Sequence, residues 1–231
     1  MKVIGLIGGM SWESTVPYYR IVNETIKERL GGLHSAKVVL YSVDFHDIER
    51  MQHAGDWDAA AAQLAEVARA VERAGADFLV LCTNTMHKVA AEIEHAVRIP
   101  LLHIADATAR EITAAGLSTV GLLGTRFTMD QPFYKERLEQ RHGLRVLVPK
   151  TRDRELVHRV IYEELCLGRI VEASRTEYRR IMAELVDQGA EAIVLGCTEI
   201  TLLVGPADAS APLFDTTGIH ARKAAERALA D

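Results

Sequence analysis

Two short stretches of the sequence end in side chains that could move a proton. The apolar run 192–195 is followed by a glycine and Cys197, and the apolar run 78–81 is followed by Cys82 and Thr83. The two stretches align at a constant offset of 197 − 83 = 114, so Thr83 matches Cys197. In an open α/β sheet, ligands bind beyond the carboxyl ends of the strands. The repeat therefore predicts two similar halves, each with a functional side chain at an equivalent strand end.

A thiol and a hydroxyl on opposite sides of one cleft suit inversion of a stereocentre. One group removes a proton from one face of a carbon, and the other delivers a proton to the opposite face. A cysteine has an ordinary pKa of about 8.5, which a helix N-terminus can lower, whereas an aliphatic hydroxyl is far less acidic. We therefore expect Cys197 to act as a thiolate base at neutral pH and Thr83 to act as a proton donor.

Strand and helix patterns alternate along the whole chain. A second repeat supports the duplication, because the strand and glycine turn near Gly5 recur near Gly121 at an offset of 121 − 5 = 116. We predict an α/β fold of two pseudo-symmetric lobes, each a mostly parallel sheet flanked by helices, with the active site in the cleft between them. The predicted lobes are 1–110 and 111–214, and we expect the C-terminal helix, about 215–231, to pack on the first lobe.

The expected elements follow from apolar periodicity. Residues 44–52 are predicted to form a loop. The expected strands are 3–7, 37–43, 78–81, 100–104, 119–123, 144–148, 192–195 and 212–215, and the expected helices are 16–30, 57–74, 86–97, 106–115, 132–141, 155–166, 170–188 and one that begins at 217.

Composition excludes several classes of protein. The 231 residues are 48% hydrophobic and carry a net charge of −5, and no basic stripe follows a phosphate backbone, so nucleic acid is not an expected partner. Three cysteines without CxxC spacing argue against a disulfide framework and for a reducing compartment. No stretch has the length of about 20 apolar residues that a membrane span needs. We expect a cytoplasmic protein that does not bind membranes.

The glycine turn after the first strand does not have the spacing of a dinucleotide site. Gly5-x-x-Gly8-Gly9 differs from GxGxxG, so a nicotinamide or flavin cofactor is not favoured. The glycines either make only a tight turn or let backbone amides approach a small carboxylate, and we favour the second interpretation. None of the nine histidines shows the spacing of a metal site. We expect no cofactor and no metal.

Three motifs resemble one known family. Residues 8–14 (GGMSWES), 81–87 (LCTNTMH) and 195–200 (LGCTEI) are similar to signatures of the cofactor-independent aspartate/glutamate racemases. The similarity covers essentially the whole chain and is greatest to the bacterial branch that is L-aspartate/glutamate-specific or of broad specificity. This resemblance implies two α/β lobes, an amino-acid substrate, a homodimer, and no pyridoxal phosphate or metal.

The resemblance also implies roles for individual residues. The family uses two cysteines as acid and base on opposite faces of Cα, but here Thr83 stands directly before Asn-Thr, so the role of the first cysteine passes to Thr83. Cys82 is shifted by one position and is expected to point away from the cleft. The second-lobe cysteine, Cys197, is implied to face the α-hydrogen of the L-enantiomer, which predicts faster turnover of L-substrates.

The implied substrate-binding residues lie at the same strand ends. Met10 lines the pocket, Gln52 contacts the α-carboxylate, and amides and hydroxyls from two further pairs hold the same group, with the alternative that these pairs only cap helices. The pairs are Asn84 with Thr85 and Thr198 with Glu199. His87 either assists Thr83 or is a solvated helical histidine.

Two other functions compete with racemisation. A Thr/Cys pair is weaker than a symmetrical pair, which would fit a carboxylate-binding module without turnover. The third candidate is a cysteine-dependent decarboxylase or cis–trans isomerase of diacids.

Overall fold

The computed structural model describes residues 1–230, which form two compact units. The first comprises Met1–Ile104 with the C-terminal segment that starts at His220, and the second comprises Ala105–Ile219. No helix in the described part of the chain is long and apolar enough to cross a membrane.

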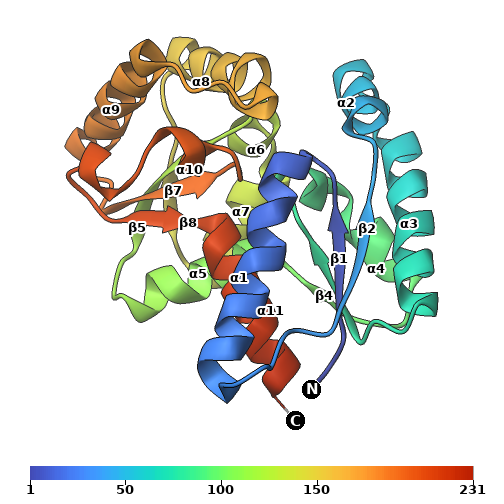
Figure 1. Ribbon diagram of the computed structural model, residues 1–231. Helices are drawn as coiled ribbons and strands as arrows, with labels where there is room; N and C mark the ends of the chain where they lie inside the picture. Colours follow the sequence, from blue (N-terminus) through green and yellow to red (C-terminus); the bar gives the residue numbers. More distant parts are fainter. Residues whose placement is uncertain (231) are drawn as a thin grey trace. The chain divides into compact units, whose positions relative to one another are not determined.

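The first unit is a parallel sheet with the strand order β2-β1-β3-β4 (Figure 1). The central strands are apolar along their whole length because helices cover both faces. The elements are β1 (Ile4–Gly8), α1 (Trp12–Leu30), β2 (Val38–Ser42), α2 (Phe45–Ala54), α3 (Trp57–Arg73), β3 (Phe78–Leu81), the 3₁₀ helix η1 (Thr85–Val89), α4 (Ala90–Ala96), β4 (Leu101–Leu102) and α11 (Thr216–Leu229).

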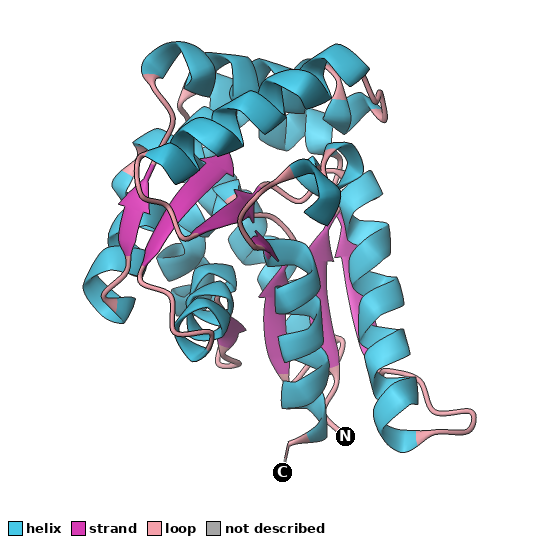
Figure 2. Cartoon of the chain, turned by 90° about the vertical axis from the view of Figure 1, so that its left-hand side faces the viewer, coloured by secondary structure: helices cyan, strands magenta, loops and turns pink. Residues whose placement is uncertain are grey.

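Side chains of β3 alternate between two cores. Leu79 and Leu81 pack with α2, α3 and α4, in what we call the α3 core, whereas Phe78 and Val80 pack with α1 and α11, in the α11 core. Small alanines of α11 allow this helix to lie close to the sheet. Lys2 at the start of the chain bonds the carbonyls of Ala228 and Ala230, so the chain ends lie side by side (Figure 2).

The second unit repeats this plan with the strand order β6-β5-β7-β8, again all parallel. Helices α8 and α9 pack on β5 and β7 around residues such as Val157, Ile181 and Ile193. The elements are α5 (Ile104–Ala114), β5 (Thr119–Gly124), α6 (Arg126–Asp130), α7 (Pro132–His142), β6 (Arg145–Leu147), α8 (Thr151–Glu163), η2 (Leu165–Leu167), α9 (Glu172–Asp187), β7 (Ala192–Gly196), α10 (Ile200–Leu203), η3 (Pro206–Asp208) and β8 (Leu213–Asp215).

The same strand permutation in both sheets confirms the predicted α/β fold of two similar halves. One element was predicted wrongly, since 44–52 is not a loop but contains most of helix α2. The Asp44 carboxylate accepts the His46 amide at 3.0 Å and caps the helix, and Gly55 ends it in the left-handed conformation. The expected helix 86–97 is divided into η1 and α4, and α1 begins four residues earlier than the expected start at residue 16.

Candidate active site

The turn after β1 positions Met10. Gly9 has φ = 88°, and a Cβ at this position would lie 2.3 Å from the Val43 carbonyl oxygen, so glycine is required. The Gly9 amide donates to the Thr15 hydroxyl at 2.8 Å, which ties the turn to the first turn of α1. Met10 is consequently buried in the α3 core.

The turn after β3 buries a row of polar side chains. Thr83, Asn84 and Thr85 are all under 8% exposed although each is polar, and they follow directly on the buried strand. Asn84 occupies the N-cap position of η1 without a capping hydrogen bond from its side chain, so its side chain does not serve as a helix cap. Cys82 is fully buried in the α11 core, on the same side of the sheet as Val80.

Gln52 reaches the same turn from helix α2. Its side chain is buried, and Nε2 donates to the Met86 sulfur at 3.0 Å, within η1. The structure thus brings Gln52 and the turn after β3 together within the first unit. The sequence pattern assigned Gln52 to a loop, whereas helix α2 fixes the direction of its side chain.

His87 is buried, so the alternative of a solvated helical histidine is wrong. Its Nδ1 lies 2.7 Å from the Thr83 carbonyl oxygen, and its Nε2 accepts the Ile104 amide at 3.2 Å. The rings of His103 and His220 lie beside it, with centroids 4.4 and 6.0 Å away. His103 and His220 could not be predicted from the sequence, because these residues have no regular spacing and come together only in the fold.

In the second unit, the turn after β7 places a thiol within hydrogen-bond distance of a carboxylate. Cys197, Thr198 and Glu199 are buried. The Cys197 thiol donates to Glu199 Oε2 at 3.0 Å, and the Thr198 hydroxyl donates to the same oxygen at 2.7 Å. Glu199 stands at the N-cap of α10, but its side chain makes no capping hydrogen bond and is turned to these two neighbours instead.

This environment favours the neutral thiol. Burial raises the pKa of Cys197 well above its ordinary value, and the Glu199 charge raises it further. The expected thiolate at neutral pH is therefore not the favoured form in this arrangement. A thiol hydrogen-bonded to a carboxylate can nevertheless become a thiolate base, because the carboxylate accepts its proton. Burial raises the pKa of the Cys82 thiol as well, but this thiol donates to the Val80 carbonyl, which cannot take up the proton.

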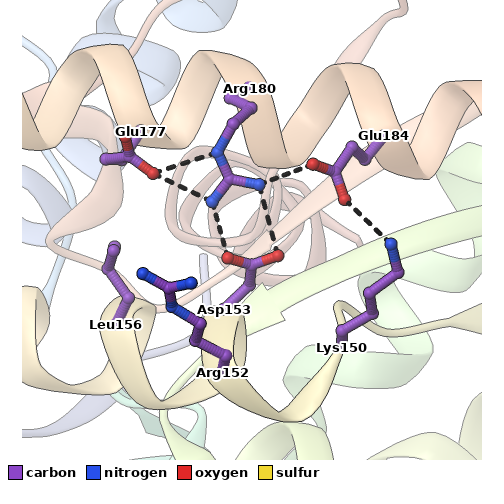
Figure 3. A pocket seen from close by; sticks show the side chains of 7 residues that line it. All are labelled: Lys150, Arg152, Asp153, Leu156, Glu177, Arg180 and Glu184. Carbon is purple, nitrogen blue, oxygen red and sulfur yellow. Dashed lines mark hydrogen bonds and ion pairs between the residues drawn. The ribbon is translucent and has the colours of Figure 1, made fainter.

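A groove of about 400 Å³ between α8 and α9 is a different kind of feature (Figure 3). Arg180 bonds Asp153, Glu177 and Glu184, and Lys150 lies 3.6 Å from Glu184. Hydrogen bonds from Arg180 hold the pKa of Asp153 below its ordinary value. These charges satisfy one another, so we assign the groove to surface structure. Among residues 1–230, no group of three or more histidine, cysteine or acidic side chains has the arrangement of a metal site.

The two parallel α/β units have the same topology, and Cys197 follows β7 of the second unit just as Thr83 follows β3 of the first. The chain belongs to the Asp/Glu/hydantoin racemase family, whose model matches residues 7–224. This confirms the resemblance seen in the sequence and places the chain among the isomerases.

Individual relatives cover the chain from end to end. It is 60% identical to a candidate Asp/Glu racemase of known structure from Yersinia pestis, with a TM-score of 0.93 over 100% of both chains. It is 36% identical to an aspartate racemase homologue from Pyrococcus horikoshii OT3, with a TM-score of 0.84 over 99% of each chain. The broad specificity amino-acid racemase RacX from Bacillus subtilis (strain 168) is 23% identical over 240 residues and 99% of both chains.

Proposed function

We propose that the protein is a cofactor-independent racemase that interconverts L- and D-aspartate or glutamate by two-base proton transfer at Cα. The observation that carries this proposal is the hydrogen bond from the Cys197 thiol to Glu199 Oε2 at the end of β7, because the carboxylate can take the proton that the thiol must lose to become a base. The names of the relatives support an amino-acid substrate, and the name of the Bacillus subtilis protein supports tolerance of several side chains.

The proposed reaction from the L-enantiomer begins at Cys197. Its proton moves to Glu199, and the resulting thiolate takes the α-proton of the substrate. Thr83 donates its hydroxyl proton to the opposite face of the carbanion, which gives the D-enantiomer. Water then returns a proton to the Thr83 oxygen and accepts the one held by Glu199, which restores the starting state. A hydroxyl is a poor base, so we expect slower removal of the α-proton from D-substrates.

The substrate carboxylate is proposed to bind at the polar turns. The Thr85 hydroxyl and the Asn84 amide offer donors, Gln52 adds another, and Met10 lines the pocket. The Thr198 hydroxyl becomes a donor to the substrate when it gives up its bond to Glu199. The Glu199 carboxylate would repel the substrate carboxylate, so we assign its side chain to Cys197 and keep only its backbone amide as a substrate donor. A homodimer and a cytoplasmic location stay predictions, and sedimentation velocity measures the first.

Incubation with a panel of L- and D-amino acids in D₂O tests the function. We expect α-deuteration and formation of the opposite enantiomer for aspartate or glutamate without added cofactor. Tight binding without deuteration would instead indicate a carboxylate-binding module, and loss of a carboxyl group or a change of double-bond geometry in a diacid would indicate the third candidate function.

Replacement of Glu199 by glutamine is expected to lower the pKa of Cys197 and, at the same time, to lower kcat. Because the Glu199 charge raises the pKa of this thiol, the variant should titrate at lower pH when thiolate absorbance is followed. Loss of the proton acceptor should nevertheless lower kcat for the L-substrate by roughly 10²-fold or more. Glu184→Gln, which neutralises an acid of the surface network, is the matched control. A lower pKa with undiminished kcat would show that Glu199 does not accept the proton.

Replacement of Gln52 by alanine is expected to weaken substrate binding. The Met86 sulfur is a weak acceptor that a substrate carboxylate can displace, so the amide is suited to bind substrate. Loss of this donor should lower kcat/KM by about 1–3 kcal/mol, mostly through KM. Gln63→Ala on helix α3 is the control for loss of an amide from the same unit. Steady-state kinetics with unchanged KM in Gln52→Ala would remove the residue from the site.

A further inference from the structure

The His87 side chain bridges two backbone segments of the first unit. Nε2 accepts the Ile104 amide at 3.2 Å, so this nitrogen carries no proton. The proton of the neutral ring is then on Nδ1, which donates to the Thr83 carbonyl oxygen at 2.7 Å. Hydrogen bonds to the main chain thus engage both ring nitrogens, which fixes the tautomer and the orientation of the ring.

The Thr83 carbonyl oxygen accepts a hydrogen bond from the His87 side chain, and the main-chain amide that would bond it in an α-helix is used elsewhere. In an α-helix, the amide of residue 87 would bond the carbonyl of residue 83. Here η1 is a 3₁₀ helix, and the His87 amide bonds the Asn84 carbonyl at 3.1 Å. The imidazole of His87 therefore supplies to Thr83 a hydrogen bond that a main-chain amide would otherwise make.

Two further histidine side chains pack against the His87 ring. The His103 and His220 rings pack beside it. His220 Nδ1 lies 2.9 Å from the Tyr18 hydroxyl, and its Nε2 donates to the Leu102 carbonyl oxygen at 2.7 Å. Ile104 and His220 are the two positions at which the chain leaves and re-enters the first unit. His87 therefore links Ile104 to the strand end that carries Thr83, whereas the hydrogen bonds of His220 go to Tyr18 and to Leu102.

We propose that His87 is a positioning residue for the proton donor Thr83. It holds the Thr83 backbone through the carbonyl, and so sets the direction of the hydroxyl, without exchanging protons itself. The inference rests on the proposed role of Thr83. It predicts that loss of His87 impairs delivery of the proton to the second face of Cα while removal of the first proton by Cys197 continues.

The measurement starts from L-aspartate or L-glutamate in D₂O and follows two products. Deuterated L-substrate reports proton removal and return on the Cys197 face, and deuterated D-product reports delivery by Thr83. In His87→Phe, we expect the ratio of D-product to deuterated L-substrate to fall at least tenfold, with total deuteration of the L-substrate within about threefold of the parent. His87→Asn keeps a short-range amide donor for the Thr83 carbonyl and should restore most of the ratio.

A matched control comes from His95 on α4. Its Nδ1 makes the same type of bond, to the carbonyl four residues before it, at 2.6 Å, but the side chain is exposed. His95→Phe should leave the ratio unchanged. If His87→Phe does not fold, His87→Asn is compared with His87→Gln, whose longer side chain places its amide beyond the Nδ1 position, and only the asparagine should keep the ratio near that of the parent.

The outcomes distinguish the positioning role of His87 from the proposed role of Thr83 as proton donor. An unchanged ratio in His87→Phe, or in His87→Gln where the phenylalanine variant does not fold, overturns the positioning role if Thr83→Ala is deficient in D-product. An equal loss of both products in soluble, folded His87 variants also overturns it, because that result describes general damage. If Thr83→Ala itself still forms D-product at the parent rate, the proposed role of Thr83 fails and the positioning role fails with it.

Discussion

Replacement of Cys197 by alanine should abolish α-deuteration of L-aspartate and L-glutamate. The thiol is the group that removes the α-proton in the proposed reaction, and alanine offers no base, so the rate should fall by roughly 10³-fold or more. The measurement is NMR or mass detection of α-deuterium in the recovered L-substrate and in the D-product. Far-ultraviolet circular dichroism checks that the variant is folded.

Cys82→Ala is the matched control for this result. Cys82 is fully buried in the α11 core, so its loss should cost about 1 kcal/mol of stability through a small cavity while deuteration continues. The opposite pattern, in which Cys197→Ala exchanges at the parent rate and Cys82→Ala does not, would show that the alignment at an offset of 114 residues is in the wrong register and that Cys82 is the base.

Replacement of Thr83 by cysteine should accelerate deuteration that starts from the D-enantiomer. Each pKa unit by which a thiol is more acidic than a hydroxyl corresponds to about 1.36 kcal/mol, so a thiolate at this position forms far more readily than an alkoxide. We expect the initial rate from D-aspartate or D-glutamate to rise by roughly tenfold or more. The equilibrium between enantiomers cannot change, so the gain must appear in the kinetics of the D-direction.

Two further variants at position 83 test whether the gain comes from the acidity of the thiol. Thr83→Ser keeps a hydroxyl and should show no gain, and Thr83→Ala should deuterate the L-substrate while forming little D-product. If Thr83→Cys and Thr83→Ser behave alike from the D-enantiomer, proton affinity at residue 83 does not limit this direction, and the proposed kinetic preference for L-substrates has another origin.

Several candidate site residues could be located from the sequence because they follow strands that are apolar along their whole length. A run such as 192–195 can be recognised without knowledge of the fold, and Cys197 and Glu199 directly follow it. Gln52 was harder, because helix α2 is short and its stability depends on the Asp44 cap and on packing of Ile48 against the α3 core. The pattern 44–52 alone does not separate such a helix from a loop.

The sequence by itself determined the duplication, the α/β class and the family, since these depend on periodicity and local motifs that repeat along the chain. Only the tertiary structure decided how the functional groups are charged and held. The pKa of Cys197 depends on burial and on where the Glu199 carboxylate points, and the bond from His87 to Thr83 depends on a 3₁₀ turn. The physical reason is that hydrogen bonds and electrostatic shifts depend on distances of a few ångströms, which spacing in the sequence does not specify.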